Sequence, residues 1–506
     1  MEGTRVQVLE ELDAWASDAD SSKVYWMLGM AGIGKSSIAH TFCQILEAKN
    51  MLGSSFFASR ASEKTSNARL IIPVIAHGLA RSSPPIKIEV VKAIEDDSTL
   101  AEPTFSNMRE QFKKLVVDPI QMTTGMVDKP CKVVVIDAVD ECGNLEVVAS
   151  FIKLVLQSAP KTPLKVFISS REELEISNVF SSVYNDAKNF RLHDIEKDVV
   201  QEDICKYLET SLANIRDKNC HGTAEAWPSQ TELQDLTTRC GTLFIYAATA
   251  VRYIASGGKR YKSRLSEMAK QGLESVTEFK TDIDTLYIHI LEMACKEKPS
   301  HEVTPMRDIV SIIVFLRNPL PIQAIETLSE MDASSDLSPL TSVIHIPNAK
   351  EATVAPFHAS FPDFITSPTR CSPDRFSSGR STFRALDASE GHKLLALKCL
   401  ILMNRLLKYN ICEIPTELTL SHRERTNSPE NVGKISEALK YSCLHWAAHL
   451  AKVGVFDPEL VKGLHVFLHE HLLHWIECLS TLGELQTGLK SLGSMVDVLS
   501  VSRVPE

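Results

Sequence analysis

The sequence VYWMLGMAGIGKS, at residues 24–36, decides how the first part of this chain folds. Its last eight residues match the pattern G-x-x-x-x-G-K-[ST] without deviation. The five residues before the pattern are β-prone, and a helix-like segment runs from Ser37 to Lys49. Because this pattern binds phosphate when a strand precedes it and a helix follows it, residues 24–48 predict a P-loop. The alternative is a glycine-rich turn that matches by chance.

Each residue type in the loop has a physical reason. Glycines let the backbone curl so that successive amide N–H groups face an anion, and the following helix adds the positive end of its dipole. Lys35 is expected to reach the β- and γ-phosphates, and the Ser36 hydroxyl is expected to ligate Mg²⁺. The predicted nucleotide-binding residues of the loop are Gly29, Met30, Ala31, Gly32, Ile33, Gly34, Lys35, Ser36 and Ser37.

A second motif is acidic. Residues 133–137 read VVVID, a hydrophobic strand that ends in a carboxylate. Since such a strand lies beside the P-loop strand in these folds, we expect Asp137 to contact Mg²⁺ directly or through water. Asp140 or Glu141 could orient the attacking water, because hydrolysis needs a base near the γ-phosphate. The alternatives are a helix N-cap for Asp137 and a solvated turn for the other two.

Arg171 directly follows the strand-like run from Lys165 to Ser170. An arginine at the carboxyl end of a buried strand is well placed to sense the γ-phosphate. A surface salt bridge is the alternative. The chain has no N-K-x-D sequence, an element of guanine specificity, so ATP is favoured over GTP.

Strand-like and helix-like segments alternate through the first 194 residues, which predicts an α/β P-loop NTPase domain with a parallel sheet and helices on both faces. After residue 195 the strand signals fade, and the stretch from Ser229 to Ile254 is expected to be helical. Two short β-like runs at 342–346 and 352–357 follow further helices and suggest a winged helix. The predicted divisions are a nucleotide-binding domain at 1–194, a helical domain at 195–275, a winged-helix domain at 276–366, a mobile linker rich in Ser, Arg, Thr and Pro at 367–388, and a second helical domain at 389–506.

Composition narrows the function classes. The net charge of -10 and the lack of basic runs disfavour general binding of nucleic acid. The 12 cysteines are scattered and contain no C-x-x-C pair, which favours reduced thiols. No signal peptide and no membrane-spanning run is visible, so a cytoplasmic protein is expected. His445 and His449 lie four apart on a predicted helix, but Trp446 replaces the glutamate of H-E-x-x-H, which disfavours a zinc site.

Several further stretches carry a resemblance to a known family. They are residues 3–5 (GTR), 24–26 (VYW), 53–60, 111–115 (QFKKL), 118–119 (DP), 135–142 (VIDAVDEC), 241–248 (GTLFIYAA) and 357–364 (FHASFPDF). Because these stretches occur in this order, the chain resembles fungal NACHT-domain proteins of the STAND class over roughly residues 3–450. Such proteins are NLR-like signalling P-loop NTPases.

The resemblance implies a nucleotide-binding, a helical, a winged-helix and a second helical domain. It implies that ADP keeps the domains closed, and that exchange for ATP opens them and permits self-oligomerisation. His358 matches the winged-helix histidine that touches the β-phosphate of ADP in related proteins; a packed histidine is the alternative. Phe244 stands near a proline that many relatives place on the nucleotide. Relatives usually carry an effector domain and repeats, so a truncated product, or a switch that borrows effector and sensor proteins, is expected.

The sequence therefore favours a slow ATPase that binds ATP or ADP with Mg²⁺ and acts as a molecular switch. A P-loop kinase of small molecules shares the same loop, and it would show fast turnover with an acceptor. A scaffold that holds nucleotide without hydrolysis is the third possibility.

Overall fold

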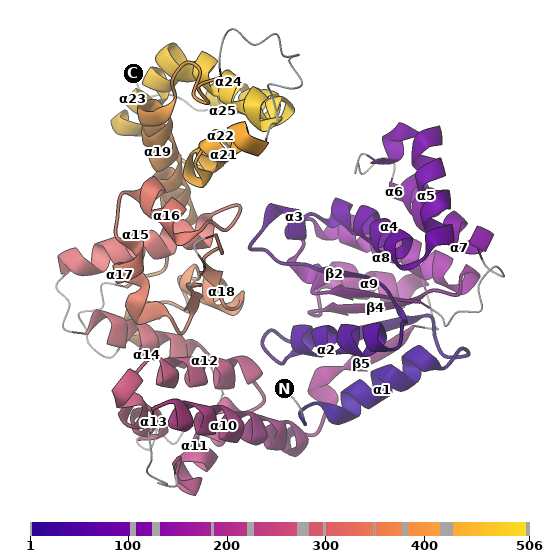
Figure 1. Cartoon of the computed structure of the whole chain (residues 1–506). Helices are drawn as coiled ribbons and strands as arrows, with labels where there is room; N and C mark the ends of the chain where they lie inside the picture. Colours follow the sequence, from indigo (N-terminus) through magenta and orange to yellow (C-terminus); the bar gives the residue numbers. More distant parts are fainter. Residues whose placement is uncertain are drawn as a thin grey trace. The chain divides into compact units, whose positions relative to one another are not determined.

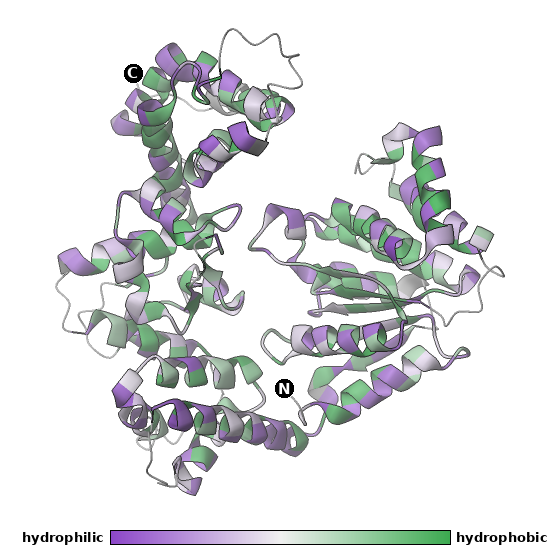
Figure 2. Cartoon of the chain, viewed as in Figure 1, coloured by the Kyte–Doolittle hydropathy of each residue, from purple (hydrophilic) through white to green (hydrophobic). Residues whose placement is uncertain are grey.

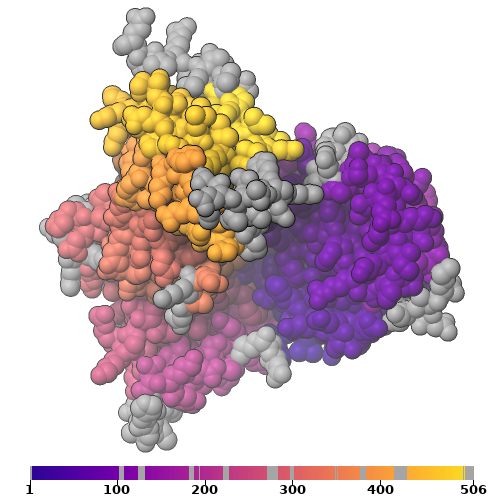
Figure 3. Space-filling model, turned by 45° about the horizontal axis from the view of Figure 1, so that its top comes forward, coloured from indigo at the N-terminus to yellow at the C-terminus, as the bar shows by residue number. Residues whose placement is uncertain are grey.

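The computed structural model describes most of the chain as two compact units, Met1–Ile283 and Asp284–Glu506, and each is treated by itself. Figure 1 and the space-filling view of Figure 3 colour both along the sequence, from indigo to yellow. The described residues are 3–101, 108–123, 132–183, 187–219, 227–270, 283–296, 300–347, 349, 351–376, 383–414 and 429–501.

A parallel five-stranded sheet organises the first unit. Its strand order is β2-β3-β4-β1-β5. The strands are β1 Val24–Leu28, β2 Leu52–Phe57, β3 Val133–Asp137, β4 Lys165–Ser170 and β5 Lys188–Arg191. Every residue of β1, β3 and β4 is buried, as expected for strands covered on both faces. Figure 2 colours the sheet and its helices by hydropathy, with hydrophobic residues in green. The predicted parallel sheet is confirmed.

Alternate side chains of β1 serve two separate cores. Val24, Trp26 and Leu28 pack with helices α4, α8 and α9. Tyr25 and Met27 face the other way and pack with α1 and α2. Figure 1 shows these two helical layers on opposite faces of the sheet. The helices of this α/β part are α1 Val6–Ser17, α2 Lys35–Ala48, α3 Glu63–Ser66, α4 Ile71–Ser82, α5 Pro84–Asp96, α6 Met108–Phe112, α7 Asp118–Thr123, α8 Leu145–Ser158 and α9 Leu174–Val183.

Among the described residues after the sheet, the first unit continues with the helices α10 Lys197–Asn219, α11 Gln230–Cys240, α12 Phe244–Ala255 and α13 Tyr261–Lys270. The stretch 229–254, predicted to be helical, is divided into two helices, because the chain breaks after Cys240. Gly241 adopts φ 54° and ψ -112°, a backbone conformation that residues other than glycine rarely adopt. The break allows α12 to start in a new direction, with its first turn against the P-loop.

The second unit is mostly helical, with a small antiparallel pair formed by β6 Ile344–His345 and β7 Ala355–Pro356. Its helices are α14 Ile283–Cys295, α15 Ser300–Phe315, α16 Ile322–Ser329, α17 Ala333–Leu337, α18 Ser360–Ile365, α19 Ala388–Leu406, α21 Pro429–Lys434, α22 Glu437–Leu450, α23 Pro458–Val466, α24 Leu472–Leu482 and α25 Leu485–Val501. Within the described ranges, none of the helices has both the length and the apolar character needed to cross a membrane.

The segment 367–388, predicted to be a mobile linker, is anchored where it is described. Arg370 donates to the carboxylate of Asp284 on α14 through Nη2 at 2.7 Å and Nε at 3.0 Å, and Arg375 adds a bond of 3.3 Å. Cys371 and Phe383 are completely buried. The described part of this segment therefore packs as part of the second unit.

Replacing Gly241 by alanine tests the backbone break. Gly241→Ala is expected to lower the free energy of unfolding by about 1–3 kcal/mol, because a Cβ is strained at this φ and ψ. Urea unfolding followed by circular dichroism measures the change. Gly433→Ala on α21 is the control, since a Cβ there meets no atom within 4 Å and alanine favours the helix. Equal stability of Gly241→Ala and wild type would contradict the strain.

Candidate functional site

The P-loop lies between the end of β1 and the start of α2. The amide of Gly29 donates to the carbonyl of Ser170 at 3.2 Å, which ties the loop to β4. Gly32 and Gly34 adopt φ 81° and 102°, and Gly34 is the N-cap of α2. The first amides of a helix have no acceptor inside the helix, so those of α2 remain available to an anion. Gly29, Ile33 and Lys35 are buried, whereas Met30, Ser36 and Ser37 are exposed, and Ala31, Gly32 and Gly34 are intermediate.

Lys35 is buried with its ammonium beside the loop. Its Nζ donates to the carbonyl oxygens of Gly29 at 2.5 Å and Met30 at 3.0 Å. Burial lowers the pKa of Lys35, while the carboxylate of Asp140 acts in the opposite direction. The lysine therefore points into the region where the acidic residues gather, as a phosphate-binding lysine must.

Asp137, at the end of β3, meets Ser36 of α2 although β3 and the P-loop strand β1 are not neighbours. The prediction that the acidic strand lies beside the P-loop strand is wrong, because β4 lies between β1 and β3. The Asp137 carboxylate nevertheless interacts with the Ser36 hydroxyl. Ser169 of β4 bridges the gap: its hydroxyl donates to Asp137 Oδ1 and accepts from the amide of Ala138 at 2.9 Å.

The Asp137 carboxylate and the Ser36 hydroxyl suit a magnesium ion. Burial raises the pKa of Asp137, and the hydrogen bonds from Ser169 and Ser36 act against that rise. A cation beside the carboxylate would relieve its desolvation, and Mg²⁺ prefers hard oxygen ligands such as a hydroxyl and a carboxylate. The residues present therefore fit the predicted ion.

Asp140 and Arg171 are brought together at the carboxyl ends of β3 and β4. Asp140 Oδ1 accepts from the amide of Arg171 at 3.0 Å, and Oδ2 lies 3.2 Å from Arg171 Nε. The ion pair anticipated as an alternative for Arg171 is thus present, but its partner is a buried carboxylate of the site. The turn that carries Asp140 begins at Ala138, which adopts φ 53° in the left-handed region.

Glu141 follows on the same turn. Its Oε2 accepts from the amide of Arg60 at 3.3 Å, so the loop after β2 also contributes to the site. Burial raises the pKa of Glu141, and the neighbouring Asp140 charge acts in the same direction. A carboxylate with a raised pKa is a better proton acceptor than an ordinary one.

His358 belongs to the second unit, so its predicted contact with nucleotide stays a prediction. Its Nδ1 accepts from the amide of Ser360 at 3.1 Å and lies 2.8 Å from the Ser360 hydroxyl. That hydroxyl lies 2.8 Å from Tyr287 Oη. These contacts hold the imidazole at the start of α18.

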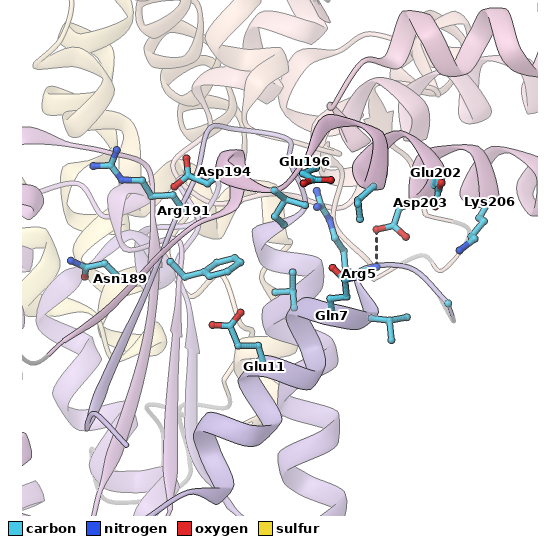
Figure 4. A pocket seen from close by; sticks show the side chains of 16 residues that line it. Arg5, Gln7, Glu11, Asn189, Arg191, Asp194, Glu196, Glu202, Asp203 and Lys206 are labelled. Carbon is cyan, nitrogen blue, oxygen red and sulfur yellow. Dashed lines mark hydrogen bonds between the residues drawn. The ribbon is translucent and has the colours of Figure 1, made fainter. Parts of the chain in front are cut away.

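A cavity of about 760 Å³ adjoins the P-loop through Arg5 (Figure 4). Arg5 lines the cavity, and its Nη2 donates to the P-loop carbonyl of Ile33 at 3.0 Å. The remaining walls come from α1, the end of β5 and the start of α10. Lining side chains labelled in Figure 4 are Gln7, Glu11, Asn189, Arg191, Asp194, Glu196, Glu202, Asp203 and Lys206. Sequence reasoning noted residues 3–5 only for their resemblance and missed this cavity, because its walls are distant in sequence.

Comparison with known proteins adds two findings to this geometry. The family model of the nephrocystin 3 N-terminal region matches residues 3–171, which hold the P-loop and the acidic strand. The vegetative incompatibility protein HET-E-1 of Podospora anserina is 20% identical over 504 residues, which is 95% of this chain and 35% of that protein. These matches support the resemblance of the chain to NACHT/STAND-type proteins. The chain spans about a third of the length of HET-E-1.

Two of the solved structures that are similar to this chain come from Pyrococcus species. A STAND ATPase with a tetratricopeptide repeat sensor from Pyrococcus horikoshii matches with a TM-score of 0.40 and 13% identity, over 97% of this chain and 64% of that one. A Walker-type ATPase of Pyrococcus abyssi matches with a TM-score of 0.35 and 15% identity, over 71% of this chain and 94% of that one.

The histidines on α22 bond to other groups of the protein. His449 Nδ1 lies 2.9 Å from Nδ1 of His392 on α19, and its Nε2 lies 2.7 Å from Tyr441 Oη. His445 Nε2 lies 3.1 Å from the side-chain amide of Asn318. Because the two Nδ1 atoms can share only one proton, at least one of the His392 and His449 rings must be neutral in this contact.

Burial lowers the pKa of His392 and His445 to about 4 and that of His449 to about 2. The positive charges of Arg317 and Lys452 add to the effect. A depressed folded-state pKa means that the unfolded chain binds more protons between pH 6.5 and pH 4, so stability falls as the pH falls through this window.

We expect the urea midpoint of the chain to drop between pH 7.5 and pH 5.5, with a contribution of about 1 kcal/mol per pH unit from each fully buried histidine. His449→Gln should flatten this dependence. The exposed His465, replaced by glutamine, serves as the control and should leave the slope unchanged. If the urea midpoint depended on pH equally in wild type and His449→Gln, buried His449 would not be a source of this pH dependence.

Proposed function

We propose that this chain is an ATP- and ADP-binding molecular switch of the NACHT/STAND class, in which slow ATP hydrolysis controls domain opening and self-oligomerisation. The observation that carries the proposal is the convergence of Lys35, Ser36 and Asp137 with Asp140 at one edge of the sheet. This edge offers amides and an ammonium for phosphates and oxygen ligands for Mg²⁺. The ion would neutralise charge on the phosphates when bound.

The cavity beside Arg5 is proposed to hold the nucleoside. The cavity adjoins the P-loop, because Arg5 lines the cavity and donates to the carbonyl of Ile33. Arg5 Nε and Nη1 are buried and have no hydrogen-bond partner among the described residues. Buried donors without partners are costly, and acceptors of a base or ribose would satisfy them. Carboxylates such as Asp194 and Glu196 could accept from ribose hydroxyls or an exocyclic amine.

The ion pair between Asp140 and Arg171 supports a way to distinguish ATP from ADP. A γ-phosphate would compete with Asp140 for the Arg171 guanidinium, since both are anions. Release of the pair would free Asp140 or leave Glu141 to orient the attacking water. Turnover is expected to be slow, because Arg171 must first leave a partner that holds it through both backbone and side chain.

The remaining parts of the proposal concern the rest of the chain. We propose that 195–275 and 389–506 act as helical domains, that 276–366 acts as a winged helix, and that His358 contacts the β-phosphate of ADP. The activating and effector partners would be separate proteins or further domains. Ten of the cysteines are free thiols, which suits a reducing cytoplasm.

Lys35→Ala tests the nucleotide site. The affinity for ADP and ATP with Mg²⁺ is expected to fall about 10- to 100-fold, because a hydrogen bond to a charged group contributes about 1.5–3 kcal/mol. Isothermal titration calorimetry measures it. The control is Lys49→Ala, which removes an exposed lysine paired with Asp13. Equal affinities of wild type and Lys35→Ala would remove the basis of the proposal.

Glu141→Gln separates a hydrolysing switch from a scaffold. The single-turnover rate of ATP hydrolysis should fall about 100-fold or more while binding is retained, because a general base contributes about 10²–10⁴-fold. The control is Glu172→Gln, an exposed glutamate paired with Arg191. No hydrolysis by wild type would favour a scaffold, and rapid turnover only with an added small-molecule acceptor would favour a kinase.

A further inference from the structure

Two consecutive carbonyl groups of the P-loop are held from outside the loop. The amide of Ile245, in the first turn of α12, donates to the carbonyl of Gly32 at 2.9 Å. Arg5 Nη2 donates to the next carbonyl, that of Ile33, at 3.0 Å. The two donors come from segments 240 residues apart in the sequence. They act on neighbouring peptide units at the centre of the loop.

The planarity of the peptide bond gives these contacts a consequence. In a trans peptide the C=O and N–H groups of one unit point in opposite directions. When the carbonyl of Gly32 faces Ile245, the amide of Ile33 faces the other way. When the carbonyl of Ile33 faces Arg5, the amide of Gly34 points away from Arg5. The two outside donors therefore orient two inside amides that can bind phosphate.

Arg5 is itself held in place. Its side chain is only 8% exposed, and its backbone amide donates to Asp203 Oδ2 on α10 at 3.0 Å. The guanidinium lies 5.0 Å from the ring centroid of Phe244, a cation–π contact. Burial lowers the pKa of Arg5, but an arginine stays protonated in proteins. Arg5 thus joins α10, α12 and the P-loop at one point.

Helix α12 also approaches the loop closely. A Cβ placed on Gly32 would lie 2.1 Å from Ile245 Cγ2, so a side chain at this position would have to displace Ile245 of α12. Phe244, which stands near the position where relatives carry a proline, lies 4.0 Å from the corresponding point on Gly34. The loop and the first turn of α12 therefore fit together with no room for a larger residue at Gly32.

We propose that Arg5 and the Ile245 amide are positioning groups that hold the P-loop amides toward the phosphate. The inference rests on the proposed nucleotide site and adds to it a residue outside the P-loop pattern. Because the same two peptide units bind phosphate on one side and Arg5 and α12 on the other, phosphate binding and the docking of α10 and α12 are thermodynamically linked. A phosphate that reorients either peptide would loosen these helices, and loss of Arg5 would weaken phosphate binding.

Inorganic pyrophosphate is the probe, because it fills the P-loop and cannot reach the nucleoside cavity. Arg5→Met keeps the length of the side chain and removes its donors. Its affinity for pyrophosphate with Mg²⁺, measured by calorimetry, should fall about tenfold, and Arg5→Lys should recover part of the loss. Added guanidinium at millimolar concentration should partly restore binding to Arg5→Ala, which a general loss of packing would not allow.

Arg264→Met is the matched control. Arg264 also lies over an aromatic ring, that of Tyr253 at 4.4 Å, and donates to a backbone carbonyl, but it does not contact the P-loop. This variant should keep wild-type affinity for pyrophosphate even if its melting temperature falls. If Arg5→Met misfolds, Arg5→Lys and Phe244→Leu test the same contact with smaller changes, and each should weaken pyrophosphate binding.

The outcomes separate the inference from the function on which it rests. If wild type binds neither pyrophosphate nor ADP, the proposed nucleotide site fails. Suppose instead that wild type binds pyrophosphate and ADP and that Lys35→Ala binds neither. If Arg5→Met then binds pyrophosphate as tightly as wild type does, only the positioning role of Arg5 is overturned. A loss of ADP affinity with unchanged pyrophosphate affinity would also overturn it, because Arg5 would then act on the nucleoside alone.

Discussion

Parallel pairing of β1, β4 and β3 is the constraint on which the candidate site depends. In a parallel sheet the carboxyl ends of all strands meet at one edge, so the loops that follow them lie together. The P-loop follows β1, Arg171 follows β4, and Asp137 ends β3. A strand-order change or a register slip would separate these groups even if every residue were kept. Ser169, one strand away from both partners, completes the edge by its hydrogen bonds to Asp137 and Ala138.

The contacts around the P-loop explain how a phosphate site can communicate with helices. Most loops that bind anions are described by the groups that face the ligand. Here the opposite side of the same peptides contacts Arg5 and the first turn of α12. A peptide cannot turn its amide toward a ligand without turning its carbonyl the other way. The arrangement therefore places the first turn of α12 in direct contact with the centre of the P-loop, behind amides of the candidate phosphate site.

The second unit uses buried polar groups in a different way. Its imidazoles and the Tyr441 hydroxyl satisfy one another between α19 and α22, and Asp284 is neutralised by Arg370 and Arg375. Buried charges and dipoles specify a unique packing when all partners are present, and they become a liability when one changes its protonation. Acid therefore acts on the histidine network, whereas the arginine pair around Asp284 ties the segment after α18 to α14.

The sequence by itself determined the local chemistry. The spacing of residues 29–36 dictates a phosphate loop because glycine, lysine and serine act through backbone freedom, charge and a hydroxyl at fixed separations. The β-branched run at 133–136 and the run at 165–170 likewise predict buried strands. Only the tertiary structure decided that β4 lies between β1 and β3, that the helical stretch across Gly241 is divided into two helices, and that Arg5 reaches Ile33. Strand order and long-range hydrogen bonds depend on how whole layers pack, and no pattern along the chain records which distant donor will meet a given carbonyl.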